Sequence, residues 1–210
     1  MFNPRQLSED VSMRVLRPSD AAALASAYVR NRAYLSPWEP VRPEDYYSEE
    51  WQASDIARRL AANEAGEGHP FALFAGDTLM GRFNLAGIVR GPFQSAGLGY
   101  WVDKSYAGRG LASAAVQVIV DTARDELGLH RIEASTLLHN IGSQRVLLKG
   151  VPTDRYGAAI PTYCRKMARP QHLPSSPALG PSHVDPREWL ASPGRRQESI
   201  WSCRTGSDGE

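Results

Sequence analysis

The sequence predicts an α/β fold (α+β in its sheet order) over residues 11–150, in which a mixed, mostly antiparallel sheet is flanked by helices. Three observations support this prediction. Two strand-like runs meet at Gly76-Asp77, which is typical of an antiparallel hairpin. An apolar and aromatic run at residues 98–102 leads through a glycine turn into a helical repeat. A further strand-like run at residues 131–137 and a short helix follow, as expected for a neighbouring parallel strand.

The first part of the chain is expected to form one strand and one helix before a proline-rich loop. Residues 13–16 read as a short opening strand. Ser19 or Asp20 can serve as the N-cap of an alanine-rich helix over residues 21–32. Residues 35–43 contain three prolines, which exclude regular structure. Trp38 and Glu39 lie on this loop, and one interpretation is that the tryptophan covers the first helix.

A second helix is expected over residues 48–66, with acidic residues in its first turn, where the helix dipole favours them. Its Arg58-Arg59 pair is expected to lie on a solvated face. The hairpin strands then cover residues 71–75 and 79–89, and Gly87 inside the second strand indicates a bulge. The sheet continues through residues 96–102.

The glycine turn at residues 107–110 has the character of an anion site. Apolar residues recur at helical spacing after Gly110, and the first turn of a helix presents unpaired N–H groups and partial positive charge. Gly108 and Gly110 would let a phosphate approach the backbone, and Arg109 can add a charged contact. This central helix is expected to end near Gly128, and the last helix to cover residues 141–149.

Composition limits the classes of function. A chain of 210 residues with a net charge of +1 gives no support for nucleic acid or an anionic membrane as the main partner. No apolar run approaches a membrane span, and residues 1–10 lack the apolar segment of a signal peptide. The two cysteines, Cys164 and Cys203, both come late, so we expect a cytoplasmic protein without disulfides in its first 150 residues. No His/Cys set has the spacing of a metal site.

The segment YWVDKSYAGRGLASAAV, followed by HNIGSQRVL, resembles the GNAT superfamily of acyl-CoA-dependent N-acetyltransferases. The likeness is greatest to the RimJ/RimL type, which acetylate protein N-termini and related amines. The resemblance runs from about Val11 to about Gly150 and implies the GNAT acyl-CoA N-acyltransferase fold. It departs from the family at Ser105, where Gln or Arg is frequent.

The resemblance also implies where acetyl-CoA binds, as a cosubstrate and without a metal. The glycine turn would bind the coenzyme A pyrophosphate, and Asn140 with Ser143 would lie beside the pantetheine arm. Backbone N–H groups around Tyr100 and Val102 can polarise the thioester carbonyl. The expected cofactor-binding residues are Tyr100, Val102, Ala107, Gly108, Arg109, Gly110, Leu111, Ala112, Asn140 and Ser143.

Catalysis of acetyl transfer requires a proton for the departing thiolate and a neutral amine. Ser143 is the hydroxyl best placed for the thiolate, unless it serves only as a serine at a helix N-terminus. Glu133 and His139 are candidates for the general base. The parallel strands at residues 96–102 and 131–137 are expected to open a cleft where their ends splay apart, and Glu133 either faces this cleft or pairs with Arg131. In the resembled family the loop of Trp38 and Glu39 covers the acceptor site, so this pair could also contact an amine.

We therefore expect an acyltransferase that moves acetyl from acetyl-CoA to a primary amine, most readily a protein N-terminus of the ribosomal-protein alanine type. It would act as a monomer or dimer. Two alternatives stay open: an acetyltransferase for small-molecule amines, and a non-catalytic acyl-CoA-binding remnant. Turnover of acetyl-CoA over a panel of amines, compared with binding of acetyl-CoA alone, separates catalysis from binding.

Residues 151–210 form a Pro/Ser/Arg-rich tail of different character, which contains eight of the 15 prolines and no sustained periodicity. We expect this tail to be disordered. The resembled family continues past N-x-x-S-x-x-V-L with a pattern near GFxxxGMAPRYLxIxGxWQDHxxF, which builds its final strands. Codons for residues 150–174 read from the second base permit each named position of that pattern, and Met167-Ala168 forces its tryptophan. The tail is thus expected to be translated out of frame, which leaves the domain at residues 11–150 incomplete.

We predict that re-sequencing the gene around the Lys149 codon will reveal a single-base insertion or deletion. The chain as written would then lack its last strands, and its activity would be low. In that case Cys164 and Cys203 have no structural role. An intact reading frame, together with full activity of the 210-residue chain, would contradict this prediction.

Overall fold

The computed structural model describes residues 2–150, and the tail with its expected disorder and frameshift lies outside the described residues. Each helix and strand expected within residues 11–150 is present. The strands are β1 (Arg5–Gln6), β2 (Ser12–Val15), β3 (Gly68–Ala75), β4 (Thr78–Val89), β5 (Ser95–Val102) and β6 (Arg131–Glu133). The α-helices are α1 (Ala21–Leu35), α2 (Glu49–Glu64), α3 (Leu111–Asp125) and α4 (Ile141–Gly150), and the 3-10 turns are η1 (Pro18–Asp20), η2 (Glu44–Tyr47) and η3 (Lys104–Tyr106).

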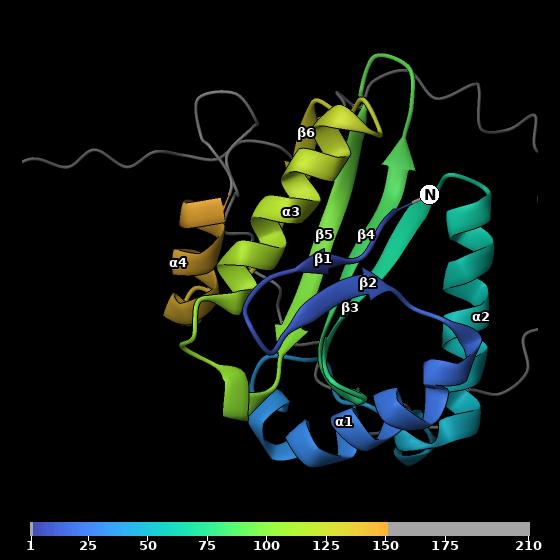
Figure 1. Cartoon of the computed structure of the whole chain (residues 1–210), viewed down its shortest axis with the longest axis vertical. Coiled ribbons are helices and arrows are strands. Elements are labelled where there is room, and N and C mark those ends of the chain that lie inside the picture. The colour runs from blue at the N-terminus through green and yellow to red at the C-terminus, as the bar shows by residue number, and fades with distance from the viewer. Residues whose placement is uncertain (1, 151–210) are drawn as a thin grey trace, which may run out of the picture. The chain divides into compact units, whose positions relative to one another are not determined.

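The strands form one sheet in the order β1-β2-β3-β4-β5-β6, so that neighbours in the sheet are neighbours in sequence (Figure 1). Every pair is antiparallel except β5 and β6, which run parallel through the connection that contains α3. This confirms the mixed, mostly antiparallel sheet. Gly87 has a φ of 63° at a shift in register between β4 and β5, which confirms the predicted bulge.

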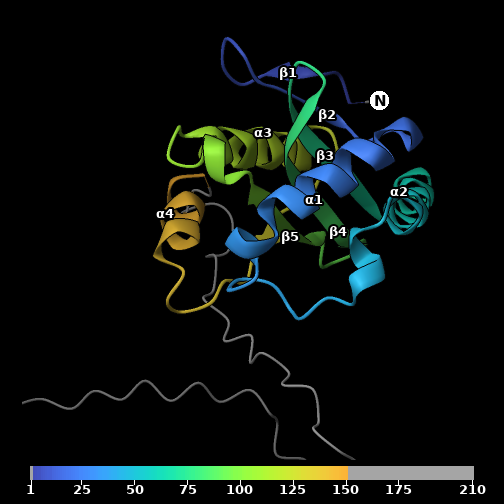
Figure 2. The same cartoon turned by 90° about the horizontal axis from the view of Figure 1, so that it is seen from below.

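Each face of the sheet carries its own hydrophobic core because side chains alternate along the strands. On one face, α3 and Leu147 of α4 pack against residues such as Phe83 and Leu98. On the other face, α1, α2 and η2 pack against residues such as Phe74 and Trp101. The helices therefore form two pairs, α3 with α4 and α1 with α2, as Figures 1 and 2 show.

Asp20, one of the two expected residues, is the N-cap of α1, but its side chain has a different partner from the one expected. Asp20 precedes α1, but its carboxylate makes no cap to the helix. It instead accepts hydrogen bonds from Arg14 at 2.7 and 2.8 Å and from the backbone N–H of Arg17 at 2.6 Å. The carboxylate thus ties β2 to the chain before α1. Ser48 does cap α2, because its hydroxyl accepts from the N–H of Trp51.

The sixth strand is shorter than expected, since it ends at Glu133 rather than at residue 137. The prediction was wrong here because the apolar pattern continues while the hydrogen bonding to β5 stops. Gln144 of α4 holds the carbonyl groups that follow, with hydrogen bonds of 3.3 Å to Leu137 and 2.7 Å to Leu138. Gln144 thus fixes the backbone of Leu137 and Leu138 after the chain has left the sheet.

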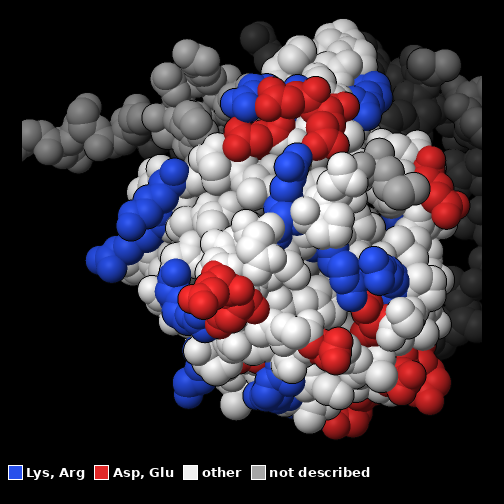
Figure 3. Space-filling view, viewed as in Figure 1, with Lys and Arg blue, Asp and Glu red and all other residues white. Residues whose placement is uncertain are grey.

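Acidic and basic side chains are interspersed on the face that Figure 3 shows, as the small net charge of +1 leads one to expect. Within residues 2–150, none of the helices combines the length and the hydropathy needed to span a bilayer.

Candidate active site

The predicted order of strand, glycine turn and helix is present at residues 95–125. Gly108 and Gly110 both have a φ of 80°, in the left-handed region that residues with a side chain rarely adopt. Gly110 is the N-cap of α3 and supplies no side-chain cap to its first N–H groups. The start of α3 therefore has the backbone geometry that suits an anion, with its dipole adding to the attraction.

Asp103, which sequence reasoning missed, anchors this turn. Its buried carboxylate accepts hydrogen bonds from Arg30 at 2.8 Å and Asn31 at 2.7 Å, both on α1, and from the N–H and hydroxyl of Ser105 at 2.9 and 2.6 Å. Asn31 also accepts from the N–H of Lys104 at 3.0 Å. The turn after β5 is thus fixed to α1 on the far face of the sheet. The only sequence signal was an aspartate directly after a strand.

These bonds determine the charge state of Asp103. Burial alone would raise its pKa, but the hydrogen bonds from Ser105, Asn31 and Arg30 outweigh burial and lower the pKa to about 2. The carboxylate is therefore ionised at neutral and mildly acidic pH. Ser105, the position that departs from the resembled family, uses both its N–H and its hydroxyl to bind Asp103.

Arg109 lies between the two glycines and pairs with Asp10 in the β1–β2 connection, at 2.8 and 2.9 Å. Its guanidinium also lies 4.6 Å from the centre of the Tyr106 ring. Both charged side chains are nearly half exposed. A phosphate would have to share Arg109 with Asp10 or displace it, so the contact expected from sequence stays a prediction.

The parallel pairing of β5 and β6 lasts for only three residue pairs, Ser95–Gly97 with Arg131–Glu133. Beyond Gly97 the two chains separate, while β5 stays paired with β4 as far as Val102. Within residues 2–150 no other strand pairs with this edge of β5. Alternate N–H groups of β5 after Gly97 therefore face the space between β5 and the chain that follows β6, which we call the gap. Tyr100 and Val102 lie on this stretch, where donors for a carbonyl oxygen were expected.

Tyr100, Asn140 and Ser143 meet across the gap. The Tyr100 hydroxyl lies 2.9 Å from the Ser143 hydroxyl, and the Asn140 side chain accepts from the N–H of Ser143 at 3.1 Å. Burial raises the pKa of Tyr100, and the bond to Ser143 lowers it by a smaller amount. The Tyr100 ring stacks on Phe83 at 5.2 Å, so its hydroxyl is held in place. The Ser143 hydroxyl is thus oriented by Tyr100, while Asn140 holds the backbone N–H of Ser143; the role of this hydroxyl as the acid stays a prediction.

The other residues expected at the site are placed as follows. Leu111 is buried in the core below α3, Ala112 is half-buried beside it, and Ala107 is exposed at the end of η3. Glu133 is exposed and forms an ion pair of 2.7 Å with Arg131, one of the two arrangements considered from sequence. Its assignment as the general base stays a prediction.

On the opposite face of β5 lies a hollow of about 400 Å³, which we call the α2-side pocket. Its aromatic walls come from α1, η2, α2 and β5 and consist of Tyr28, Tyr46, Trp51 and Trp101. Gly99 and Asn84 form part of its floor. The pocket thus abuts β5 where that strand has no β6 neighbour, and the Tyr100–Ser143 pair lies on the other face of the same stretch.

A charged cluster that sequence reasoning missed lies at the base of the α2-side pocket. Asp55 and Arg82 are both about 2% exposed, and Arg82 donates to Asp55. Arg58 and Arg59 also donate to Asp55, with a distance of 2.9 Å for Arg59. The expected solvated face is confirmed for Arg58, whose side chain is 70% exposed, whereas Arg59 is 32% exposed, and both arginines also pair with the buried carboxylate. Burial opposes this ionisation, but the arginines lower the pKa of Asp55 to about 2.

The loop of Trp38 and Glu39 reaches both regions. The Trp38 ring lies 5.5 Å from the His139 ring, in the segment after β6, and Trp38 is 38% exposed. Glu39 lines the α2-side pocket. The tryptophan therefore contacts the mouth of the gap instead of merely covering α1.

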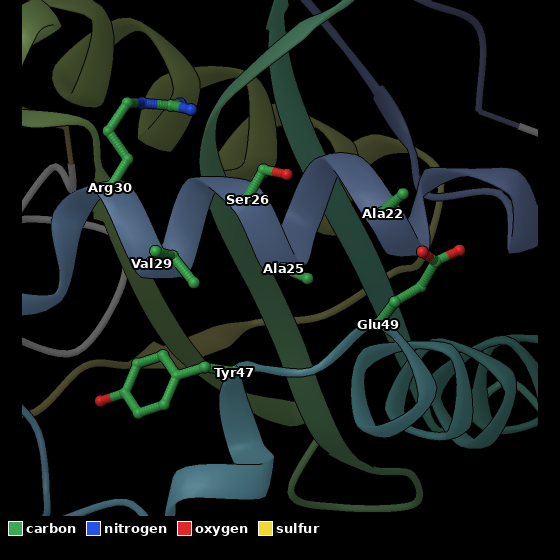
Figure 4. Close-up of a pocket in the computed structure, with 7 residues that line it drawn as sticks. All are labelled: Ala22, Ala25, Ser26, Val29, Arg30, Tyr47 and Glu49. Carbon is green, nitrogen blue, oxygen red and sulfur yellow. The ribbon is translucent and has the colours of Figure 1, made fainter.

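A second hollow, of about 440 Å³, lies between α1 and the start of α2 (Figure 4). It is lined by Ala22, Ala25, Ser26, Val29, Arg30, Tyr47 and Glu49. None of these residues comes from β4, β5 or the glycine turn, so this hollow is separate from the gap. Residues 2–150 contain no group of three or more His, Cys, Asp or Glu side chains arranged to hold a metal ion.

Stability should depend on pH through Asp103. Its pKa is about 2 in the folded protein and 3.8 when unperturbed, so its stabilising effect is present above pH 4 and is lost as the pH falls towards 2. We expect Asp103→Asn to remove about 2 kcal/mol of this pH-dependent stability. Urea unfolding between pH 2 and 7 measures it, with Asp77→Asn in the exposed hairpin turn as the control. Equal pH dependence in both variants would contradict the anchor role.

Comparison with known proteins shows the family of the chain. The model of the acetyltransferase (GNAT) domain family matches residues 10–150. The chain is 37% identical over 141 residues to a probable N-acetyltransferase, YjcK, of Bacillus subtilis, with 66% of this chain and 78% of that protein covered. It is 32% identical over 148 residues to the ribosomal protein uS5-alanine N-acetyltransferase of Escherichia coli, with 69% and 76% covered.

Among solved structures, RimJ of Mycobacterium smegmatis in complex with CoA-disulfide superposes with a TM-score of 0.62 at 31% identity, with 65% of this chain and 67% of that chain covered. These matches confirm the resemblance seen in the sequence, including its RimJ/RimL type. The protein is an acyltransferase whose cosubstrate is acetyl-CoA and whose acceptor is an amine. The chain belongs to the GNAT acetyltransferase family.

Proposed function

We propose that this enzyme acetylates the α-amino group of a protein N-terminus, with a ribosomal protein as the acceptor. One observation carries the proposal: the α2-side pocket and the Tyr100–Ser143 pair lie on opposite faces of the unpaired stretch of β5. An acceptor entering through the pocket would meet a thioester lying in the gap. The names of relatives support this acceptor, since the Escherichia coli protein acts on alanine of ribosomal protein uS5.

The glycine turn and the gap would bind different parts of acetyl-CoA. The N–H groups at the start of α3 would hold the pyrophosphate, and the pantetheine arm would run past Asn140 into the gap. Free N–H groups of β5 near Tyr100 and Val102 would donate to the thioester oxygen as negative charge develops there. Ser143 would then give a proton to the departing thiolate, with Tyr100 as its hydrogen-bond partner.

The relatives named for ribosomal proteins also support a cytoplasmic location, where such acceptors and acetyl-CoA occur together. The charged α2-side pocket favours a polar acceptor with a cationic amine. It does not by itself distinguish a protein N-terminus from a small amine. A direct assay of acceptors decides between these two functions.

The test is turnover of acetyl-CoA by the full chain with three kinds of acceptor. These are peptides with a free N-terminal alanine or serine, the same peptides with a blocked N-terminus and an internal lysine, and small amines. We expect acetylation of the free N-termini alone, located by mass spectrometry. Turnover only with small amines would overturn the proposal, and binding of acetyl-CoA without any turnover would favour the non-catalytic alternative.

Gly108→Asp should weaken coenzyme A binding by about a hundredfold or more, because it introduces a negative charge beside the pyrophosphate. Gly76→Asp in the β3–β4 turn is the matched control. That glycine also has a positive φ, of 57°, and open space around it. Isothermal calorimetry compares the two variants, and equal affinities would remove the pyrophosphate assignment.

Ser143→Ala should lower kcat by about tenfold or more while the Kd for coenzyme A changes less than about twofold, since a general acid acts only in the leaving step. Ser54→Ala on α2, where the hydroxyl is exposed and bonds only to Glu50, serves as the control. Equal losses in kcat and coenzyme A affinity would instead make Ser143 a binding residue.

A further inference from the structure

The α2-side pocket contains an ion pair, Glu39 with Arg42, whose members make no hydrogen bond to each other. The Nε atom of Arg42 lies 3.8 Å from Oε2 of Glu39, beyond hydrogen-bond distance. The two side chains are 34% and 22% exposed. The Arg42 N–H is buried, and within residues 2–150 it has no hydrogen-bond partner. Buried donors are normally satisfied, so an open donor beside an open carboxylate indicates a place for a ligand.

The other charged side chains of the α2-side pocket form hydrogen bonds with one another. Asp55 accepts from Arg58, Arg59 and Arg82, which leaves it little capacity for a ligand. Arg82 also contacts Asn84 at 3.4 Å. Within the described part of the chain, the carboxylate of Glu39 accepts no hydrogen bond at all. It is therefore the group of this pocket that can receive a cation.

We propose that Glu39 and Arg42 bind the first residue of the acceptor together. Glu39 receives its α-ammonium group, and the Nε–H of Arg42 donates to its carbonyl oxygen. This inference rests on the proposed function and adds the chemical class that the pocket selects: an α-amine with an adjacent carbonyl. A lysine side chain or a simple alkylamine has no such carbonyl and would use only half of the site.

The position of the loop suits this role. Glu39 follows Trp38, whose ring lies against His139 at the mouth of the gap. The N–H of Trp38 bonds to the carbonyl of Leu35 at 2.8 Å and the N–H of Glu39 to the same carbonyl at 3.1 Å, so the loop continues the end of α1. Glu39 thus has a fixed backbone beside the unpaired stretch of β5.

Glu39 would also take the proton that activates the amine. Its carboxylate accepts one proton from the ammonium, and the neutral nitrogen attacks the thioester carbonyl carbon. The C–N bond forms and the C–S bond breaks. Of the two protons that the nitrogen loses, one passes through Glu39 to solvent and the other replaces the proton that Ser143 gives to the thiolate.

The charges around Glu39 determine where it titrates. Arg42 lies on its own loop, Arg82 faces it from β4, Asp55, Arg58 and Arg59 from α2, Tyr46 from η2 and Tyr28 from α1. Burial raises the pKa of Glu39, and the two arginines Arg42 and Arg82 lower it by less. The base form is lost as the pH falls, so kcat/KM should decline on the acid side at a higher pH than an ordinary glutamate would give.

The first test uses the full chain and an alanine-terminated peptide over a range of pH. Glu39→Gln should lower kcat/KM by about a hundredfold, while the affinity for coenzyme A is retained. It should also remove the decline of kcat/KM at low pH, which we call the acid limb of the pH profile. Glu44→Gln is the matched control, since Glu44 lies nearby in η2, is exposed and pairs with Arg32 at 2.7 Å. It should stay within about twofold of the wild type. Glu133→Gln should keep the acid limb.

The second test separates the two contacts. Arg42→Lys keeps the charge but removes the Nε–H, so KM for the peptide should rise about tenfold. Isopropylamine, which has the α-carbon and methyl groups but no carbonyl, serves as a competitor of the peptide, and its inhibition constant should be the same for the wild type and this variant. Arg32→Lys is the control for the same change in the exposed pair.

The outcomes are distinct. Loss of the acid limb in Glu133→Gln rather than Glu39→Gln would overturn the role of Glu39, as would wild-type activity of Glu39→Gln. An equal effect of Arg42→Lys on KM for the peptide and on the inhibition constant of isopropylamine would overturn the carbonyl contact. In each of these cases wild-type turnover of peptides leaves the proposed function intact. If the wild type acetylates small amines and no peptide, the proposed function and this inference both fail.

Discussion

The separation of β5 from β6 is the constraint on which the active site depends. Three paired residues hold the two strands parallel, and after Gly97 no strand within residues 2–150 pairs with this edge of β5. Unpaired N–H groups in a protein interior are costly unless a ligand or water satisfies them. The gap is therefore a site that acetyl-CoA can complete, because a thioester and the amides of pantetheine supply the acceptors that β6 does not.

The backbone on each side of the gap is fixed by hydrogen bonds from side chains of α1 and α4. Asp103 fixes the turn after β5 to Arg30 and Asn31 of α1, and Gln144 of α4 holds the backbone that departs from β6. These contacts use side chains from helices on opposite faces of the sheet. The opening is thus kept by hydrogen bonds at its two ends, and its interior stays free for a substrate.

The alternation of side chains along β5 places the two substrate sites that we propose on different faces of the sheet. Tyr100 points to the side of α3 and α4, where it meets Ser143, and Trp101 points to the side of α1, where it donates to Tyr28 at 3.0 Å. One stretch of backbone can therefore present a thioester to an amine held on its other face. The buried Asp55–Arg82 pair stabilises the amine side, since removal of either partner would leave an unpaired buried charge.

The sequence by itself determined the order of elements, the hairpin, the bulge at Gly87, the glycine turn before α3 and the family. These features depend on local pattern and backbone conformation, which are encoded within a few residues. The tertiary structure decided the end of β6, the anchor at Asp103, the pairing of Arg58 and Arg59 with Asp55, and the open pair of Glu39 and Arg42. Each of these depends on which distant residues share a buried environment, and desolvation and charge pairing there cannot be calculated from spacing along the chain.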